Sequence, residues 1–271
     1  MVTQPESQDP QDPQDPQDPQ SQGHAHEHPH ARREAEPPAF PGGTAISGLH
    51  VYDSTAPDGH CGGSPHVHLA CTEAYVVVGG FGELHTLTAA GAVQTPLSSG
   101  VVAWFGPGTV HRAVNLGGAL RVIVVMQNSG LPEAGDAVLT FPPEVLADPA
   151  AYQRAVQVDD ERSARRRRDL AVEGYLRLVK ETAAGNAEAL VEFYRQAIAL
   201  RADRLDEWEA AWRSGPLAAA QRTAGHIAAL REGWTDHLLA AGVRAESPPG
   251  ADDRAFGMCG RLDTYRFGPP K

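Results

Sequence analysis

Three histidines and one glutamate have the residue types and the spacing of a metal site. In the stretch PHVHLACTEAYVVVGG, His66 and His68 are separated by one residue, and Glu73 follows five residues after His68. His111 lies further along the chain, in FGPGTVHRAVN. Three neutral imidazoles and one carboxylate bind a divalent first-row metal well, and a six-coordinate ion would keep two positions open. The alternative interpretation is an ordinary strand with polar residues at its mouth.

The surrounding sequence predicts the β-strands that such a site needs. Between residues 45 and 141, short runs rich in β-branched and aromatic residues alternate with Gly, Pro, Asn and Ser, which is typical of an all-β sandwich or barrel. Residues two apart in a strand point to the same side, so His66 and His68 should project together. A tight turn at residues 106–108 can aim His111 into the same cavity, and Glu73 can enter it from the following strand.

On these residues the sequence resembles the cupin superfamily, which has two motifs, G-x5-H-x-H-x3,4-E-x6-G and G-x5-P-x-G-x2-H-x3-N. The first motif runs to Gly80 and matches except at its leading glycine, where this sequence has His60. The second motif runs from Gly100 to Asn115 and matches except at its proline, where this sequence has Gly106. Both departures fall in turns and leave the four ligand positions filled. This completeness favours a bound metal over a purely structural cluster.

The resemblance covers roughly residues 48–139 and implies a metal held by His66, His68, Glu73 and His111. Fe, Mn, Ni, Co and Zn are all compatible with these ligands as the one divalent transition metal ion. Together with the helical pattern of the later residues, it predicts an all-β cupin jelly-roll barrel followed by an α-helical C-terminal region.

Two further residues are candidates for catalysis. Tyr75 follows Glu73 on the same strand face and could transfer a proton near the metal, although a buried tyrosine bonded to the backbone is an equal alternative. His85 shares a strand face with Glu83 and Leu87, and the register of that strand decides whether the face is inside. Cys71, between the ligands, is expected to be a small buried residue.

Composition divides the chain into four parts. Residues 1–40 contain a QDP repeat and should form a disordered low-complexity tail, and residues 41–147 should form the barrel. Residues 148–245 should form about three helices, and residues 246–271 an irregular C-terminal tail. The histidine cluster His24–His30 in the first part could chelate metal weakly, but we expect it to have no fixed ligand.

A 3.6-residue period marks the helical part. It predicts a helix that stops near Gly185, a second helix broken by Ser214–Pro216, and a third that ends at Gly242. The arginine run Arg165–Arg168 is expected to be a solvated, partly self-paired face. The helices could cover the barrel mouth or mediate a dimer, and the resemblance to barrels that are often dimeric favours a homodimer.

Composition also bears on partners and on the compartment. The net charge of −11 argues against general nucleic-acid binding, and the absence of a long apolar run argues against a membrane span. Three cysteines are too few for a disulfide framework, so a reducing, cytoplasmic setting is expected. The expected partner is a small-molecule substrate or ligand.

The predicted function is that of a metal-dependent enzyme, of isomerase or epimerase type, that acts on a small oxygen-rich metabolite, either sugar-like or a carboxylate. Its metal would bind two substrate oxygens and act as a Lewis acid. An Fe(II) cupin dioxygenase and a non-enzymatic small-ligand binding or sensor protein are the alternatives, because a fold does not fix the chemistry.

Overall fold

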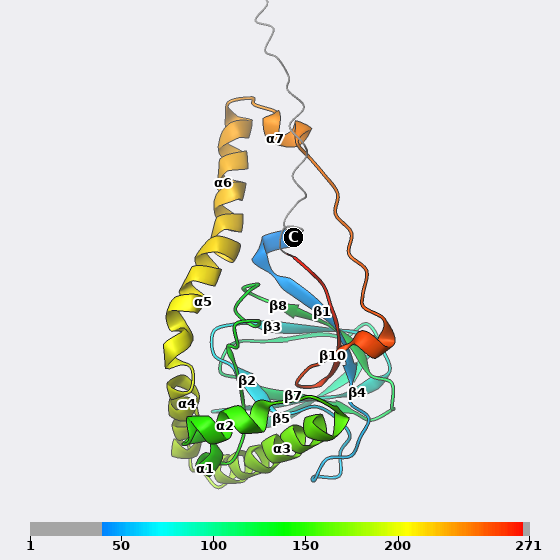
Figure 1. Ribbon diagram of the computed structural model, residues 1–271, viewed down its shortest axis with the longest axis vertical. Coiled ribbons are helices and arrows are strands. Elements are labelled where there is room, and N and C mark those ends of the chain that lie inside the picture. Colours follow the sequence, from blue (N-terminus) through cyan, green and yellow to red (C-terminus); the bar gives the residue numbers. More distant parts are fainter. Residues whose placement is uncertain (1–39, 268–271) are drawn as a thin grey trace, which may run out of the picture. The chain divides into compact units, whose positions relative to one another are not determined.

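The computed structural model describes residues 40–267, in which strands form a six-stranded and a five-stranded antiparallel sheet (Figure 1). The order is β10-β11-β1-β8-β3-β6 in the first sheet and β5-β4-β7-β2-β9 in the second. The strands are β1 (Ala45–Val51), β2 (His66–His68), β3 (Glu73–Gly79), β4 (Phe81–Thr88), β5 (Gly91–Ser98), β6 (Val102–Phe105), β7 (Val110–Asn115), β8 (Arg121–Met126), β9 (Ala137–Leu139), β10 (Ala255–Phe256) and β11 (Gly260–Thr264).

Helices follow the first nine strands. They are α1 (Pro143–Leu146), α2 (Pro149–Val156), α3 (Glu161–Ala183), α4 (Glu188–Ala199), α5 (Leu205–Trp212), α6 (Ala218–Arg231) and α7 (Asp236–Leu239). Short 3₁₀ turns lie at Pro41–Gly43, Ala202–Arg204 and Ala251–Asp253, and a π-helical turn spans Arg213–Leu217. Two antiparallel sheets followed by helices confirm the predicted fold class, a cupin jelly-roll barrel with an α-helical C-terminal region.

The five-stranded sheet contributes apolar side chains to both of its faces. Successive residues of a strand point to opposite sides, so one strand can take part in both clusters. On β7, Val110 packs outward among helical residues, whereas the next residue, His111, points into the barrel beside Phe105. The outer cluster joins side chains of this sheet to those of α1–α4: Val67, Leu87, Val110, Val138, Leu139, Phe141, Leu146, Tyr152, Ala171, Tyr175, Leu190, Phe193 and Ala197. Figure 1 shows α2 and α3 lying along this sheet.

The inner faces of both sheets form a separate core. Leu49 of β1, Val77 of β3, Leu84 of β4 and Ala113 of β7 belong to it, and each is almost fully buried. At about 25 cal/mol per Å² of buried apolar area, these two clusters supply most of the driving force for packing the layers. The site residues therefore sit between rigid, well-packed walls.

Helix α3 closely approaches the end of β9. Gly174 lies so near this segment that a Cβ atom there would meet the Thr140 carbonyl oxygen and the Phe141 backbone. The Thr140 hydroxyl donates a hydrogen bond of 2.8 Å to the Ala171 carbonyl oxygen across the same contact. The helix is thus fixed against the sheet that carries three of the four candidate ligands.

The C-terminal residues differ from the predicted irregular tail. Within 246–271, β11 pairs with β1 over Ser47–Val51, and β10 completes a hairpin with β11. The segment thereby becomes one wall of the barrel. β11 has a short strand pattern, and its partner β1 lies some two hundred residues earlier in the chain. The local sequence therefore did not predict this strand.

Two of the four arginines in the predicted solvated run are buried, which corrects that expectation. Arg168 is 1% exposed and donates hydrogen bonds to the carbonyl oxygens of Ser54 and Thr55. Arg167 donates to the carbonyl oxygen of Gly257 at the β10–β11 turn. These side chains fasten α3 to the loop before β2 and to the C-terminal hairpin, whereas Arg165 remains exposed and pairs with Glu161.

The helical part also departs from its predicted boundaries. The first helix ends near Gly185 as expected, with this residue at φ 83°. The second helix breaks after Ala199 instead of at Ser214–Pro216, which lie in the π-helical turn leading into α6. The predicted tail up to residue 39 and its histidine cluster lie outside the described residues. Within residues 40–267, no helix is both long enough and apolar enough to cross a membrane.

Candidate metal centre

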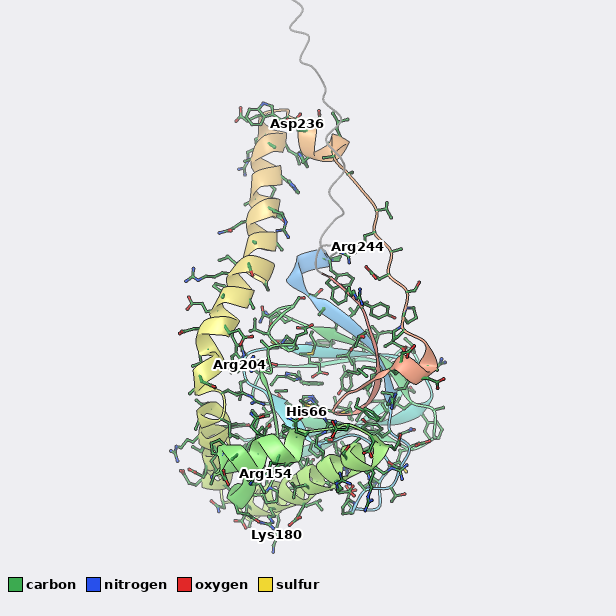
Figure 2. The ribbon with its side chains drawn as sticks, in the orientation of Figure 1. His66, Arg154, Lys180, Arg204, Asp236 and Arg244 are labelled. Carbon is green, nitrogen blue, oxygen red and sulfur yellow. The ribbon has the colours of Figure 1, made fainter. Side chains whose placement is uncertain are left out.

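The four predicted ligands converge in one buried cluster inside the barrel. One ligand atom from each of His66, His68, Glu73 and His111 lies within 4.8 Å of the others, and all four residues are buried. The two sheets bring them together: β2 carries the first two histidines, β3 carries the glutamate, and β7 pairs His111 with His66. Figure 2 shows His66 between the strands of the barrel.

A backbone or carboxylate oxygen orients each histidine ring. The Nδ1 atom of His66 lies 2.9 Å from the Ser64 carbonyl oxygen, and that of His111 lies 3.0 Å from the Thr109 carbonyl oxygen. The Nδ1 atom of His68 lies 2.7 Å from Oδ1 of Asp136. Since these oxygens only accept hydrogen bonds, each Nδ1 carries a proton and each Nε2 is left to face the cluster.

The Nε2 atoms of the histidines and the Glu73 carboxylate bring several lone pairs together at the centre of the cluster, and a positive charge there would stabilise them. The Nε2 atoms of His111 and His68 lie 3.0 Å and 3.2 Å from Oε2 of Glu73. Both Glu73 Oε2 and His111 Nε2 are buried without a hydrogen-bond partner. Two acceptors at this distance repel each other unless a proton or a cation lies between them, so the residues fit a metal ion.

The pKa shifts of Glu73 and His66 favour the protonation states that bind a metal. Burial raises the pKa of Glu73, but the neighbouring His111 and His68 outweigh it and hold this pKa well below its usual range. Burial lowers the pKa of His66 far below its usual range, with His111 and His68 adding to the effect, so its ring is neutral. An ionised carboxylate and a neutral imidazole are the protonation states that bind a metal.

His68 behaves differently in the absence of a metal. Burial lowers its pKa, but the hydrogen bond to Asp136 and the adjacent Glu73 carboxylate outweigh this effect and raise the pKa to about 10. A proton on His68 therefore supplies the positive charge in the metal-free cluster. A divalent ion that binds through Nε2 of His68 must displace this proton.

An open cavity of about 360 Å³ reaches the cluster from one side. His66, His68 and Glu73 line it, whereas the fully buried His111 lies behind them against the Phe105 ring, with ring centres 4.2 Å apart. A ligand in the cavity would therefore approach the face of the cluster opposite His111. This geometry provides room for substrate atoms at free coordination positions.

Tyr75 lines the same cavity, two residues after Glu73 on β3. It is 1% exposed, and its ring stands edge-on to His111 with centres 6.4 Å apart. Burial raises the pKa of Tyr75 well above its usual value, and the nearby Glu73 carboxylate and Cys259 thiol raise it further. The phenol thus keeps its proton beside the candidate metal centre.

His85 lies outside this cavity, which decides the register question left open by the sequence. It pairs with Arg112 of β7, one residue past His111, and therefore points to the opposite face of the sheet. There its Nε2 atom lies 2.8 Å from Oε2 of Glu83, and it lines a second pocket together with His60 and Tyr175. The structure does not bring His85 to the metal cluster.

Sequence reasoning missed Asp136 and the C-terminal lining residues. Asp136 is fully buried and belongs to the loop before β9, where nothing local distinguishes it from other loop aspartates. Met258, Cys259 and Leu262 reach the cavity from the hairpin that was predicted to be irregular. An aspartate able to orient a ligand histidine is a signal that appears only once the fold is known.

The search of protein-family models and the search of curated proteins found no match to this sequence. Solved structures that it resembles include a protein with a double-stranded β-helix domain from Klebsiella pneumoniae, at 22% identity and a TM-score of 0.26, over 35% of this chain and 78% of that one. KdgF from Halomonas sp. is similar at 22% identity and a TM-score of 0.23, over 30% of this chain and 77% of that one.

A third similar structure is WlaRA, a TDP-fucose-3,4-ketoisomerase from Campylobacter jejuni. It matches at 11% identity and a TM-score of 0.26, over 30% of this chain and 58% of the ketoisomerase. The strand order and the buried cluster themselves define the class of this protein, a barrel of two antiparallel sheets that encloses a cluster able to hold a metal ion.

Proposed function

We propose that this chain is a metal-dependent enzyme that binds one divalent transition metal ion through His66, His68, Glu73 and His111. One observation supports this proposal above the others: all three histidines have their Nδ1 atoms bonded to oxygen acceptors, and one ligand atom of each lies within 4.8 Å of one carboxylate oxygen of Glu73. The bound ion would supply Lewis-acid polarisation of the substrate oxygens. The substrate is a small molecule that presents two oxygen atoms to the free positions.

An isomerase or epimerase is the reaction type that we propose first. Such a reaction moves a proton, and Tyr75 holds one next to the cluster. Tyr75 and Glu73 are the candidates for the proton-transfer step, because His85 lies on the opposite face of the sheet. Tyr75 is a catalytic candidate on the basis of its place in the cavity.

An Fe(II) dioxygenase is the second candidate, favoured by one observation. Apart from the cluster itself, Tyr75 and Cys259 are the buried titratable side chains that line the described cavity, and neither is an ordinary base near neutral pH. Burial raises the pKa of Cys259 to about 11. A cavity poor in bases suits an oxidation better than a proton transfer.

Metal analysis with activity assays separates these functions. We expect one divalent metal ion per purified chain. Turnover of a panel of aldoses, ketoses and simple hydroxyketones without oxygen uptake would support the isomerase, whereas iron together with substrate-dependent oxygen uptake would support the dioxygenase. Full metal occupancy with turnover of no compound would favour the non-enzymatic binding or sensor protein. A chain that binds no metal would contradict the proposal.

We also propose that the protein is a cytoplasmic homodimer. Helix α6 has no buried residue, and its Ile227 and Leu230 are 46% and 55% exposed, with Trp234 just beyond it at 64%. A second copy packed on this helix would remove these side chains from water. Light scattering of the wild type and of a Leu230→Glu variant tests this, because the variant should shift the mass towards the monomer.

The buried free thiols of Cys71 and Cys259 agree with a reducing compartment.

A further inference from the structure

The walls of the metal cavity are apolar where they are deepest. Leu49 of β1 is 3% exposed, Val124 and Met126 of β8 are 7% and 8% exposed, and all three line the cavity. Met258 and Leu262 add a thioether and an aliphatic side chain from the C-terminal hairpin. A ligand that reaches the cluster must therefore lay most of its surface against carbon and sulfur.

Cations are missing from this lining. Among the described residues that line the cavity, none is a lysine or an arginine. Glu133 is the charged side chain there besides the cluster itself, and it is exposed. A phosphate or an additional carboxylate on the ligand would thus lose its hydration without gaining an ion pair, which is costly in a buried site.

Apart from the phenols of Tyr75 and Tyr265, the hydroxyl side chains of the lining lie towards the outer end of the cavity. Ser47 and Thr264 face each other across the β1–β11 pair, and they are half-buried and exposed, respectively. Two residues further in, the same strand pair presents Leu49 opposite Leu262. A buried hydroxyl without a partner costs about 1–3 kcal/mol, so a polyhydroxylated body would be penalised at several positions.

We infer that the cavity takes an uncharged ligand that presents two oxygen atoms to the metal cluster and an apolar body to the barrel wall. This inference rests on the proposed function, and it replaces the sugar-like or carboxylate metabolite expected from the sequence with a less polar class of ligand. α-Hydroxyketones, 1,2-diketones and catechols with hydrocarbon substituents belong to this class. The C-terminal hairpin sets this preference, because it contributes Met258 and Leu262 to the wall.

Two catechols with the same chelating head and different substituents test this inference. 4-tert-Butylcatechol carries an apolar group, whereas 3,4-dihydroxybenzoate carries a carboxylate in the same ring position. Each is titrated into full-length protein loaded with Co(II) and dialysed free of excess metal, and the visible absorption of the bound ion is followed. We expect 4-tert-butylcatechol to bind at least about tenfold more tightly, which corresponds to about 1.4 kcal/mol.

Equal affinity, or tighter binding of 3,4-dihydroxybenzoate, would overturn the inference and leave the metal centre standing. Failure of the protein to retain Co(II) would overturn the proposed function and this inference with it. A Leu262→Arg variant adds a cation to the wall and should reverse the preference, with Leu262→Met as the matched control that preserves it. The wild-type comparison decides the matter even where the arginine variant does not fold.

Discussion

Asp136 accepts a hydrogen bond of 2.7 Å from Nδ1 of His68 inside the barrel, and neither residue is near the other in the sequence. The carboxylate fixes the tautomer and the ring orientation, so that Nε2 points to Glu73, 3.2 Å away. Burial raises the pKa of Asp136, but the bond to His68 outweighs it and lowers this pKa below its usual value, which keeps the carboxylate ionised. Asp136 is thus a positioning residue for the candidate metal centre.

Replacing Asp136 by asparagine should weaken metal binding. The amide can donate a hydrogen bond to Nδ1 and so favour the tautomer in which Nε2 carries the proton and cannot bind a metal. We expect the metal dissociation constant to rise about 10–100-fold, measured by competition with a chromophoric chelator. Asp263→Asn is the matched control, because Asp263 also bonds to a histidine, His50, at 2.9 Å, but on the strand pair β1–β11 away from the cluster. Equal loss in both variants would contradict the positioning role.

Removal of the Arg168 side chain should destabilise the fold. This guanidinium is buried and donates to Ser54 and Thr55, so Arg168→Ala leaves carbonyl oxygens without partners as well as a void. We expect the free energy of unfolding to fall by about 2–4 kcal/mol in urea denaturation. Arg165→Ala, in the same run but exposed, should change it by less than about 0.5 kcal/mol. A small effect at Arg168 would show that the loop before β2 does not depend on α3.

The acid sensitivity of the C-terminal hairpin should depend on Asp263. Partial burial raises the pKa of this carboxyl, but hydrogen bonds from Arg254 and His50 outweigh it and hold the pKa below its usual value. Because the folded-state pKa is the lower one, ionised Asp263 stabilises the protein above its unfolded-state pKa of about 3.9. That contribution disappears as the pH falls through the folded-state pKa.

The comparison is between the wild type and Asp263→Asn from pH 7 to pH 2. The wild type should be more stable at pH 7 by about 1 kcal/mol, and the difference should vanish in acid. Unfolding is followed by circular dichroism in urea at each pH. A difference that is constant over this range would mean that the carboxylate charge does not stabilise the pairing of β11 with β1.

The sequence predicted part of the buried cluster because the spacing of His66 and His68 matches the strand period. His66 and His68 had to share a face, and the two motifs added Glu73 and His111, all four of which the structure brings together. The same period could not place His85, because a shift of one residue in the pairing of β4 with β7 exchanges the two faces. Only the observed register, with His85 opposite Arg112, settles its position.

Long-range pairing explains most of what the sequence did not predict. β11 forms by pairing with β1, which is distant in the sequence. Arg168 is buried where it bonds to Ser54 in the loop before β2. β5 has a weak strand signal, since its sequence GAVQTPLS contains proline and glutamine and most of it is exposed. Asp136 became identifiable only when β9 was paired with β2, which brings its loop to His68.

The metal content of four purified proteins tests the central claim most directly. The wild type, His111→Ala, His85→Ala and a variant that lacks residues 1–40 are loaded with the same divalent metal, passed through a desalting column and analysed by mass spectrometry for metal per chain, with circular dichroism to confirm folding. We predict about one ion per chain in the wild type and in His85→Ala, loss of most of it in His111→Ala, and no loss on deletion of residues 1–40. Full metal in folded His111→Ala, or its loss on deletion of residues 1–40, would contradict a metal centre inside the barrel.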